Sequence, residues 1–228
     1  MDDNGTRGSA VPTLALALLS FAAGSMDTLA FLALGTIFTS AMSGNTIIFG
    51  IAVGDGHVLV AAKSGTAIGG YVLGVAGATL MLSMPARRVS RVLIVESLLI
   101  AAFALLWTGT EGPSSPPALY ALINLSALAM GCQGAVGRHL KLPGVVTIVF
   151  TSTLTAIVGG TVEQLVARRR PLITAPTRQQ MATYAAYLAS AVVIAVTAAH
   201  WPAGLPFVPL AVVVGATAQF ALPGMRAT

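Results

Sequence analysis

Polar side chains interrupt apolar stretches at corresponding places in the two halves of the chain. The first half contains Gly24-Ser25-Met26-Asp27 and then Met42-Ser43-Gly44-Asn45-Thr46. The second half contains Gly131-Cys132-Gln133, which begins 107 residues after Gly24, and then Phe150-Thr151-Ser152-Thr153. Paired interruptions in the two halves of a membrane chain are typical of transport sites, where they bind small polar solutes or cations. The candidate solute- or ion-binding residues are Asp27, Gly44, Asn45, Thr46, Gln133, Thr151, Ser152 and Thr153.

Asp27 is the most informative of these residues, because it is an acid within an apolar segment. A helix that begins at Val11 would place Asp27 about 24 Å along its axis, inside the apolar layer. An acid there costs about 3 kcal/mol on insertion scales, so such acids usually face a cavity or a partner. Asp27 could bind a cation or proton, or it could cap a helix broken at Gly24 by accepting backbone N–H groups. The two interpretations are compatible.

The composition assigns the chain to the membrane proteins. Of the 228 residues 56% are hydrophobic and 8% are charged, and the mean hydropathy is +0.86. Soluble domains carry about 25% charged residues. A helix crosses a bilayer with about 20 apolar residues, and this chain has long runs without any charge. We therefore expect an all-α polytopic membrane helix bundle in contact with the lipid bilayer.

The charges between the apolar segments predict the topology. Eight apolar segments can be drawn, and we expect 36–54 and 143–166 to enter the membrane and return as re-entrant or broken half-helices. Six transmembrane helices then remain, and the basic clusters 87–91, 138–141 and 168–178 share one side with both termini. The positive-inside rule makes that side cytoplasmic. The alternative is eight crossings with a parallel repeat.

Three crossings in each half predict an inverted internal repeat. We expect one membrane domain over 1–228, made of the pseudo-repeats 11–110 and 117–222. The two re-entrant segments would then enter from opposite faces and meet near the midplane. Irregular backbone at that depth is tolerated only where protein or a water-filled cavity covers it.

A stripe of small residues marks the third apolar segment. Gly70, Gly74 and Ala78 recur every four residues, a spacing that lets another helix approach closely. The stripe could pack inside the monomer or form a homodimer seam.

The other charged residues suggest little chemistry. Glu96 lies near Arg91 and is expected to pair with it at the interface, and Arg138 and His139 could anchor the inner interface or reach the cavity. The basic residues sit in short loops, so we expect no nucleic-acid partner. The sequence lacks metal-ligand spacings, a nucleophile elbow and a nucleotide loop, and it has one cysteine, Cys132. We therefore expect no enzyme activity, no metal and no cofactor.

The residues from Gly24 to Asp27, with Phe31 and then 42–46, resemble the YoaK family of bacterial inner-membrane proteins. That family has the pattern Gly-x-x-Asp-Ala, then Phe, then Met-Thr-Gly-Asn-Thr. The second half resembles Gly-x-Gln-Asn-Ala followed by Thr-Gly-Thr-Leu-Thr, with Gly134 in place of the asparagine and Ser152 in place of the glycine. The resemblance implies about six transmembrane segments and a bacterial inner membrane, and it implies no activity.

The sequence thus predicts a transporter or channel for a small solute or ion, with a cavity near the midplane between the repeats. The alternative is a non-transporting membrane scaffold or sensor that acts through helix–helix contacts.

Overall fold

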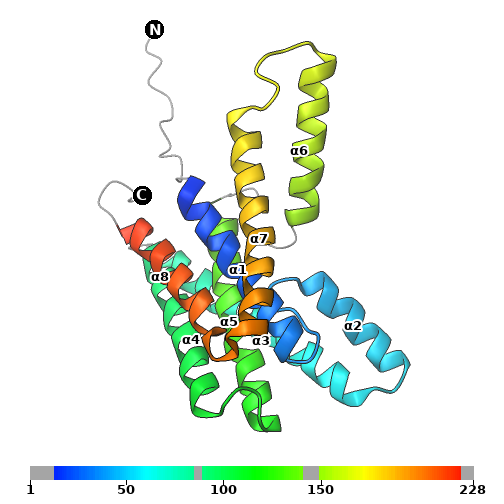
Figure 1. Cartoon of the computed structure of the whole chain (residues 1–228), viewed down its shortest axis with the longest axis vertical. Coiled ribbons are helices and arrows are strands. Elements are labelled where there is room, and N and C mark those ends of the chain that lie inside the picture. Colours follow the sequence, from blue (N-terminus) through cyan, green and yellow to red (C-terminus); the bar gives the residue numbers. More distant parts are fainter. Residues whose placement is uncertain (1–12, 85–88, 141–148, 222–228) are drawn as a thin grey trace.

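The structure is a computed structural model that describes residues 13–84, 89–140 and 149–221. These residues form helices joined by short loops, and no strand occurs among them (Figure 1). In chain order the helices are α1 (Thr13–Ala33), α2 (Met42–Gly54), α3 (Val58–Ser83), α4 (Val89–Gly109), α5 (Pro116–His139), α6 (Val149–Val166), α7 (Ala175–His200), the 3-10 turn η1 (Pro202–Gly204) and α8 (Phe207–Ala221).

Six helices are long and apolar enough to cross a membrane: α1, α3, α4, α5, α7, and η1 together with α8. The prediction of six transmembrane helices is therefore confirmed. Helix α2 has 13 residues, or about 20 Å, whereas the apolar layer is about 30 Å thick. Helices α2 and α6 are the two helices that fall in the predicted re-entrant segments 36–54 and 143–166.

The chain turns back on itself before α2. Helix α1 ends at Ala33, yet Thr39 and Ser40 bind Asp27, which lies about 9 Å back along α1. Helix α2 therefore begins beside the inner part of α1 and not beyond its end. Two features of the loop permit the reversal, namely Gly35 at φ +94° and Thr36 at φ +58°.

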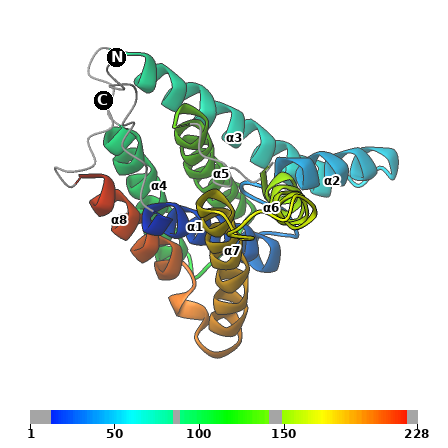
Figure 2. The ribbon, with the colours of Figure 1, turned by 90° about the horizontal axis from the view of Figure 1, so that it is seen from above.

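Helix α6 likewise begins beside the middle of a longer helix. The ring of Phe150, in its first turn, packs at a tilt against the ring of Tyr187, which is halfway along α7. Figure 1 shows α2 and α6 starting in the central part of the molecule and running to opposite ends, and Figure 2 shows α6 above the start of α2.

The core consists of two groups of helices, one around α1 and one around α5. Helix α1 packs against α7 and α8, while α5 packs against α3 and α4. Gly24 brings α1 close to α7, because a Cβ atom there would overlap Ser190 Oγ and lie 2.8 Å from the Tyr187 carbonyl oxygen. Gly131 plays the same part between α5 and α3, where a Cβ atom would overlap the Tyr71 carbonyl oxygen.

The two glycines do not break their helices. Helix α1 runs without interruption from Thr13 to Ala33, and α5 runs from Pro116 to His139. The expectation that Gly24 interrupts an apolar segment, with Asp27 as the cap of the broken helix, is wrong. Hydrogen bonds along a helix tolerate a glycine, and here the absent side chain lets two helix backbones approach.

The stripe on α3 packs inside the monomer. Gly70, Gly74 and Ala78 are buried against α5, and a Cβ atom on Gly74 would overlap the Leu128 carbonyl oxygen. These three residues are therefore already covered by the chain's own α5. A homodimer stays a prediction, and any seam would have to use another surface.

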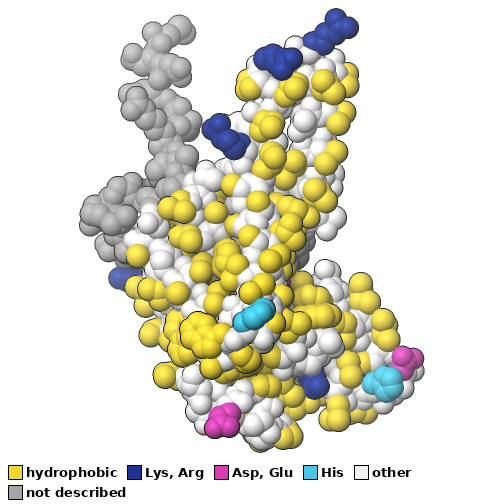
Figure 3. Space-filling view, viewed as in Figure 1, with side chains coloured by type: hydrophobic (Ala, Val, Ile, Leu, Met, Phe, Trp, Pro, Cys, Tyr) yellow, Lys and Arg dark blue, Asp and Glu magenta, His cyan; other side chains and the backbone are white. Residues whose placement is uncertain are grey.

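Charged side chains separate along the long axis of the molecule. Figure 3 shows most of the visible Lys and Arg side chains toward the end of the α6–α7 hairpin, and the visible acidic side chains at the opposite end together with one basic side chain. Arg168, Arg169 and Arg170 lie in the exposed turn between α6 and α7, whereas Asp55 and Glu111 lie in exposed loops. This asymmetry agrees with the predicted topology.

Candidate functional site

Asp27 is the centre of a buried hydrogen-bond cluster. Its side chain is 2% exposed. Oδ1 accepts from the backbone N–H groups of Thr39 (2.8 Å) and Ser40 (2.7 Å) and from Thr39 Oγ1 (3.1 Å). Oδ2 accepts from Ser40 Oγ (2.6 Å) and from the Tyr187 hydroxyl (2.9 Å). Five donors from two other parts of the chain thus compensate the desolvation of one carboxylate.

Asn45 fixes the same loop from its other side. Its Oδ1 accepts from the Phe38 N–H group (2.8 Å), and its Nδ2 donates to the Phe38 carbonyl oxygen (2.6 Å). The side chain is fully buried. Gly44 makes room for the Phe38 ring, because a Cβ atom on Gly44 would lie 2.9 Å from two ring carbons. Asp27 and Asn45 together hold the loop that precedes α2.

The start of α2 carries positive electrostatic potential. The first N–H groups of a helix have no partner within it, and the helix dipole places partial positive charge there. The N-cap residue, Ala41, offers no capping side chain. The Asp27 carboxylate, bonded to the two residues before Ala41, is the nearby negative charge.

Tyr187 links this cluster to the start of α6. Its ring centroid lies 4.1 Å from that of Phe150, and the Tyr184 ring lies 6.2 Å from the same phenylalanine. The loop before α2 and the first turn of α6 therefore both contact the Asp27–Tyr187 pair.

The hydroxyl residues of α6 differ in their environment. Thr153 is 1% exposed, and its hydroxyl has no hydrogen-bond partner among the described residues. Thr151 and Ser152 are exposed on the surface of the chain. Thr46, on α2, is also exposed and bonds back to the Met42 carbonyl oxygen at 2.8 Å. Of these four predicted residues only Thr153 is buried.

Gln133 lies apart from the Asp27 cluster. Its Nε2 donates to the Leu19 carbonyl oxygen (2.6 Å), about 12 Å from Asp27 along α1. Its Oε1 is buried without a partner among the described residues. Gln133 therefore joins α5 to α1 and does not share the site with Asn45 and Asp27.

Tyr71 of α3 lies against Gly134 of α5. Gly134 lies 107 residues after Asp27, and a Cβ atom on it would overlap the Tyr71 hydroxyl. The family pattern has an asparagine at this position, and here glycine leaves space for the Tyr71 hydroxyl. A tyrosine hydroxyl from α3 fills the space that a side chain on residue 134 would need.

Glu96 is a buried acid, whereas the sequence placed it in an ion pair at the interface. It is fully buried in α4, and neither carboxylate oxygen has a hydrogen-bond partner among the described residues. The expected pair with Arg91 is wrong, because the Arg91 side chain is exposed. The five-residue spacing of Arg91 and Glu96 already argued against a pair, since side chains five residues apart point about 140° apart around a helix.

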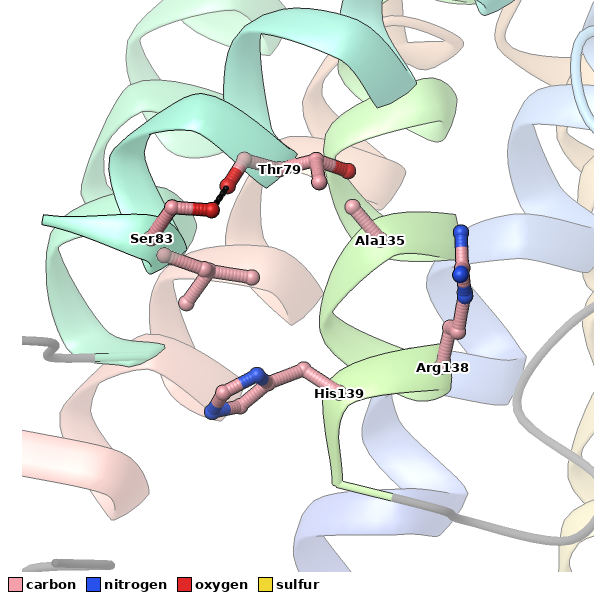
Figure 4. A pocket seen from close by; sticks show the side chains of 6 residues that line it. Thr79, Ser83, Ala135, Arg138 and His139 are labelled. Carbon is pink, nitrogen blue, oxygen red and sulfur yellow. Dashed lines mark hydrogen bonds between the residues drawn. The ribbon is translucent and has the colours of Figure 1, made fainter.

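The described pockets lie near helix ends. One of about 240 Å³ lies between the last turns of α3 and α5 and is lined by Thr79, Ser83, Arg138 and His139 among others. Figure 4 shows His139 extending toward the end of α3 and Arg138 extending to the other side of α5. Another, of about 410 Å³, lies beside Trp107 and Pro202. Asp27 lines none of these four pockets, and its side chain is buried.

A metal centre has no support within 13–84, 89–140 and 149–221. No group of three or more His, Cys, Asp or Glu side chains that could hold a metal ion occurs there. The one cysteine, Cys132, is buried, and its sulfur lies 3.8 Å from the Gly74 carbonyl oxygen. The Asp27 site contains one carboxylate and the hydroxyls of Thr39, Ser40 and Tyr187, which can rotate.

Long apolar helices around a buried acid define an integral, multi-pass membrane protein. Residues 15–219 match the family described as protein of unknown function (DUF1275), and the chain belongs to that family. The UPF0700 transmembrane protein YoaK of Bacillus subtilis (strain 168) is 31% identical over 147 residues, which confirms the YoaK-like resemblance. The match covers 62% of this chain and 64% of YoaK, less than two thirds of that relative. No solved structure matches the chain.

Proposed function

We propose that this protein is a transporter or channel for a small solute or ion. The observation that carries the proposal is that the loop before α2 and the first turn of α6 both contact the Asp27–Tyr187 pair. Helix N-termini that meet inside a membrane protein are costly to bury without a ligand or an acid. Such termini bind solutes in transporters built from inverted repeats.

Pairwise packing supports an inverted repeat. Helices α1 and α5 correspond, as do α3 and α7, because α1 packs on α7 and α5 packs on α3. Within these pairs Gly24 faces Tyr187 and Gly131 faces Tyr71. The proposed repeat therefore relates two crossings that use the same residue types at the same points. It gives the chain two similar halves that could rock against each other.

The chemistry of Asp27 favours a cation or a polar solute with hydrogen-bond donors. The N–H groups of Thr39 and Ser40 are fixed donors and hold Oδ1 in place. The hydroxyls of Ser40 and Tyr187 can rotate and present their oxygen atoms instead. A bound cation would then meet the Asp27 carboxylate and these hydroxyl oxygens. Breaking the bond between Tyr187 and Asp27 would open the cluster.

The proposed orientation follows the basic residues. The end of the molecule that carries the arginines between α6 and α7 lies in the cytoplasm, together with both termini. The membrane is the bacterial inner membrane, in line with the family resemblance. The loops at Asp55 and Glu111 then face the other side.

A non-transporting scaffold or sensor is the second candidate. The observation that favours it is the saturation of Asp27, whose two oxygens already accept five hydrogen bonds. In that case the hydrogen bonds of Asp27 serve only to hold α1, α7 and the loop before α2 together.

Uptake by proteoliposomes separates the two candidates. We would compare the native chain with Asp27→Asn for protons, monovalent cations and a panel of small polar solutes. Asparagine keeps Oδ1 for the two backbone N–H groups, and its amide can donate to the hydroxyls, so the variant removes the charge and preserves the fold. Asp55→Asn, at an exposed loop, is the matched control.

Flux in the native chain and in Asp55→Asn that disappears in Asp27→Asn would support transport through Asp27. Flux that survives equally in all three would remove Asp27 from the mechanism. No flux across the whole panel would favour the scaffold or sensor.

A further inference from the structure

Glu96 is buried in a part of the bundle that the Asp27 cluster does not use. It lies on α4, which packs against α5 and α8, and it is fully buried. Neither of its carboxylate oxygens has a hydrogen-bond partner among the described residues. The adjacent Ser97 is engaged with Thr217 of α8 at 3.0 Å, so it does not serve Glu96.

A bare carboxylate at this position is physically untenable. Burying an ionised carboxylate without a partner costs far more than a fold can supply, whereas a neutral carboxylic acid costs only a few kcal/mol. No Lys, Arg or His side chain in the described part of the chain forms an ion pair with Glu96. The negative charge must therefore be neutralised by something that the protein binds.

The surroundings suit a proton better than a metal cation. Hard cations take about six or more oxygen ligands. On α5 and α8, Gln133 Oε1 is the other buried oxygen acceptor without a partner in the described ranges. The unpartnered buried side-chain oxygens on α4, α5 and α8 are therefore too few for a cation cage, whereas a carboxylate needs only one proton to become neutral.

No titratable group in the described part of the chain supplies a positive charge next to the Glu96 carboxyl group. Cys132 on α5 is the titratable side chain that interacts with it electrostatically. Residues 207–220 of α8 contain no titratable side chain, α5 also carries Tyr120, and the titratable residues of α3 are Lys63 and Tyr71. Arg138 and His139 are exposed at the end of α5, as is Arg91 on α4 itself.

We propose that Glu96 is a proton-binding site that couples proton movement to the conformational cycle of this protein. This inference rests on the proposed transport function and assigns a proton as the coupling ion. In this proposal the proton is bound, and the carboxyl is neutral, while α4 packs against α5 and α8. When α4 parts from α5 and α8, water reaches Glu96, the O–H proton passes to that water, and the carboxylate is left solvated. Reprotonation from water on the other face allows the helices to close again.

Infrared spectroscopy tests proton binding without requiring flux. The native chain in liposomes should show the carbonyl stretch of a protonated carboxyl group that fades as the pH rises. The band should be missing from Glu96→Gln and unchanged in Glu163→Gln, because Glu163 is an exposed acid on α6. Identical spectra for the native chain and Glu96→Gln would overturn the proposal. So would a band that persists at every pH at which the protein stays folded, since such a proton never exchanges.

Chemical labelling provides a measurement that needs no variant. Dicyclohexylcarbodiimide is apolar and reacts with protonated carboxyl groups in membranes: the carboxyl proton moves to a carbodiimide nitrogen, and the carboxyl oxygen bonds to the central carbon. Mass spectrometry should find the adduct on the peptide that contains Glu96, with a rate that rises as the pH falls. Absence of that adduct at every pH would contradict the proposal.

Flux then separates this inference from the proposed function. With a pH gradient across proteoliposomes, the native chain should accumulate solute, whereas Glu96→Gln should lose accumulation and retain exchange without a gradient. Accumulation that survives in Glu96→Gln would exclude a coupling role. If the native chain shows no flux at all, the proposed function fails, while the infrared result still decides whether Glu96 binds an exchangeable proton.

Discussion

The Tyr187 hydroxyl donates a 2.9 Å hydrogen bond to Asp27 Oδ2 and so joins α7 to α1 across 160 residues of sequence. The same ring packs at a tilt against Phe150 at the start of α6. The same carboxylate holds the loop before α2. Two side chains thus connect α1 and α7 with the loop before α2 and with the first turn of α6.

Removal of the Tyr187 hydroxyl should loosen this connection without disturbing the ring contact. A hydrogen bond to a charged group contributes about 1.5–3 kcal/mol, so Tyr187→Phe should lower the free energy of unfolding by about that amount. Tryptophan fluorescence during denaturation in detergent would measure it. Tyr184→Phe is the control, because Tyr184 also contacts Phe150 and its hydroxyl makes no hydrogen bond within the described residues. Equal losses in both variants would show that the bond to Asp27 has no special weight.

Gly24→Ala should force α1 away from α7. The added methyl group would overlap Ser190 Oγ and lie 2.8 Å from the backbone oxygen of Tyr187, and overpacking of this kind costs about 1–3 kcal/mol. Thermal unfolding in detergent is the measurement. Gly50→Ala on α2 is the matched control, since its added methyl group meets no atom within 4 Å. It should be neutral or slightly stabilising, because alanine favours helix more than glycine does.

Gly74→Ala tests whether the stripe on α3 serves the monomer. A Cβ atom there would overlap the Leu128 backbone oxygen and lie 3.0 Å from the Gly131 Cα atom. We expect a marked loss of stability at every protein concentration, with the oligomeric state in detergent unchanged. Gly77→Ala, which meets no atom within 4 Å, should behave like the native chain. A stability loss that grows on dilution would instead indicate a dimer seam.

Cysteine labelling tests the two non-crossing helices. Single cysteines at Asp55, Glu111 and Arg169, in a Cys132→Ala background, would be exposed to an impermeant maleimide in oriented vesicles. With six crossings, Asp55 and Glu111 label from one side and Arg169 from the other. Eight crossings place all three on the same side, so labelling of Asp55 together with Arg169 would refute the six-crossing topology.

Much of the fold could be predicted from the sequence, because the bilayer simplifies the problem. Apolar length determines which segments cross, and the loop charges determine how many crossings are consistent. These two rules predict that the segments containing α2 and α6 do not cross. The small residues Gly70, Gly74 and Ala78 also indicated a close helix contact, although the sequence did not say with which partner.

The roles of individual polar residues were decided by tertiary contacts. Asp27 was an evident candidate, but its donors, Thr39, Ser40 and Tyr187, come from a reversed loop and from a helix about 160 residues away. Hydrogen-bond satisfaction depends on such distant partners, which no local pattern encodes. Gln133 proved to bind Leu19 and not the Asp27 cluster for the same reason.

Glu96 shows the same division most clearly. The sequence by itself determined that an acid lies within an apolar segment, and its nearness to Arg91 suggested an ion pair. Only the packing of α4 against α5 and α8 decided that the acid faces inward while Arg91 faces outward. Composition and charge thus determined the membrane class and the number of crossings, because they decide which segments lie in lipid and which loops lie in water. Burial and pairing of single side chains were decided by the helix contacts, because those bring together residues that are far apart in the chain.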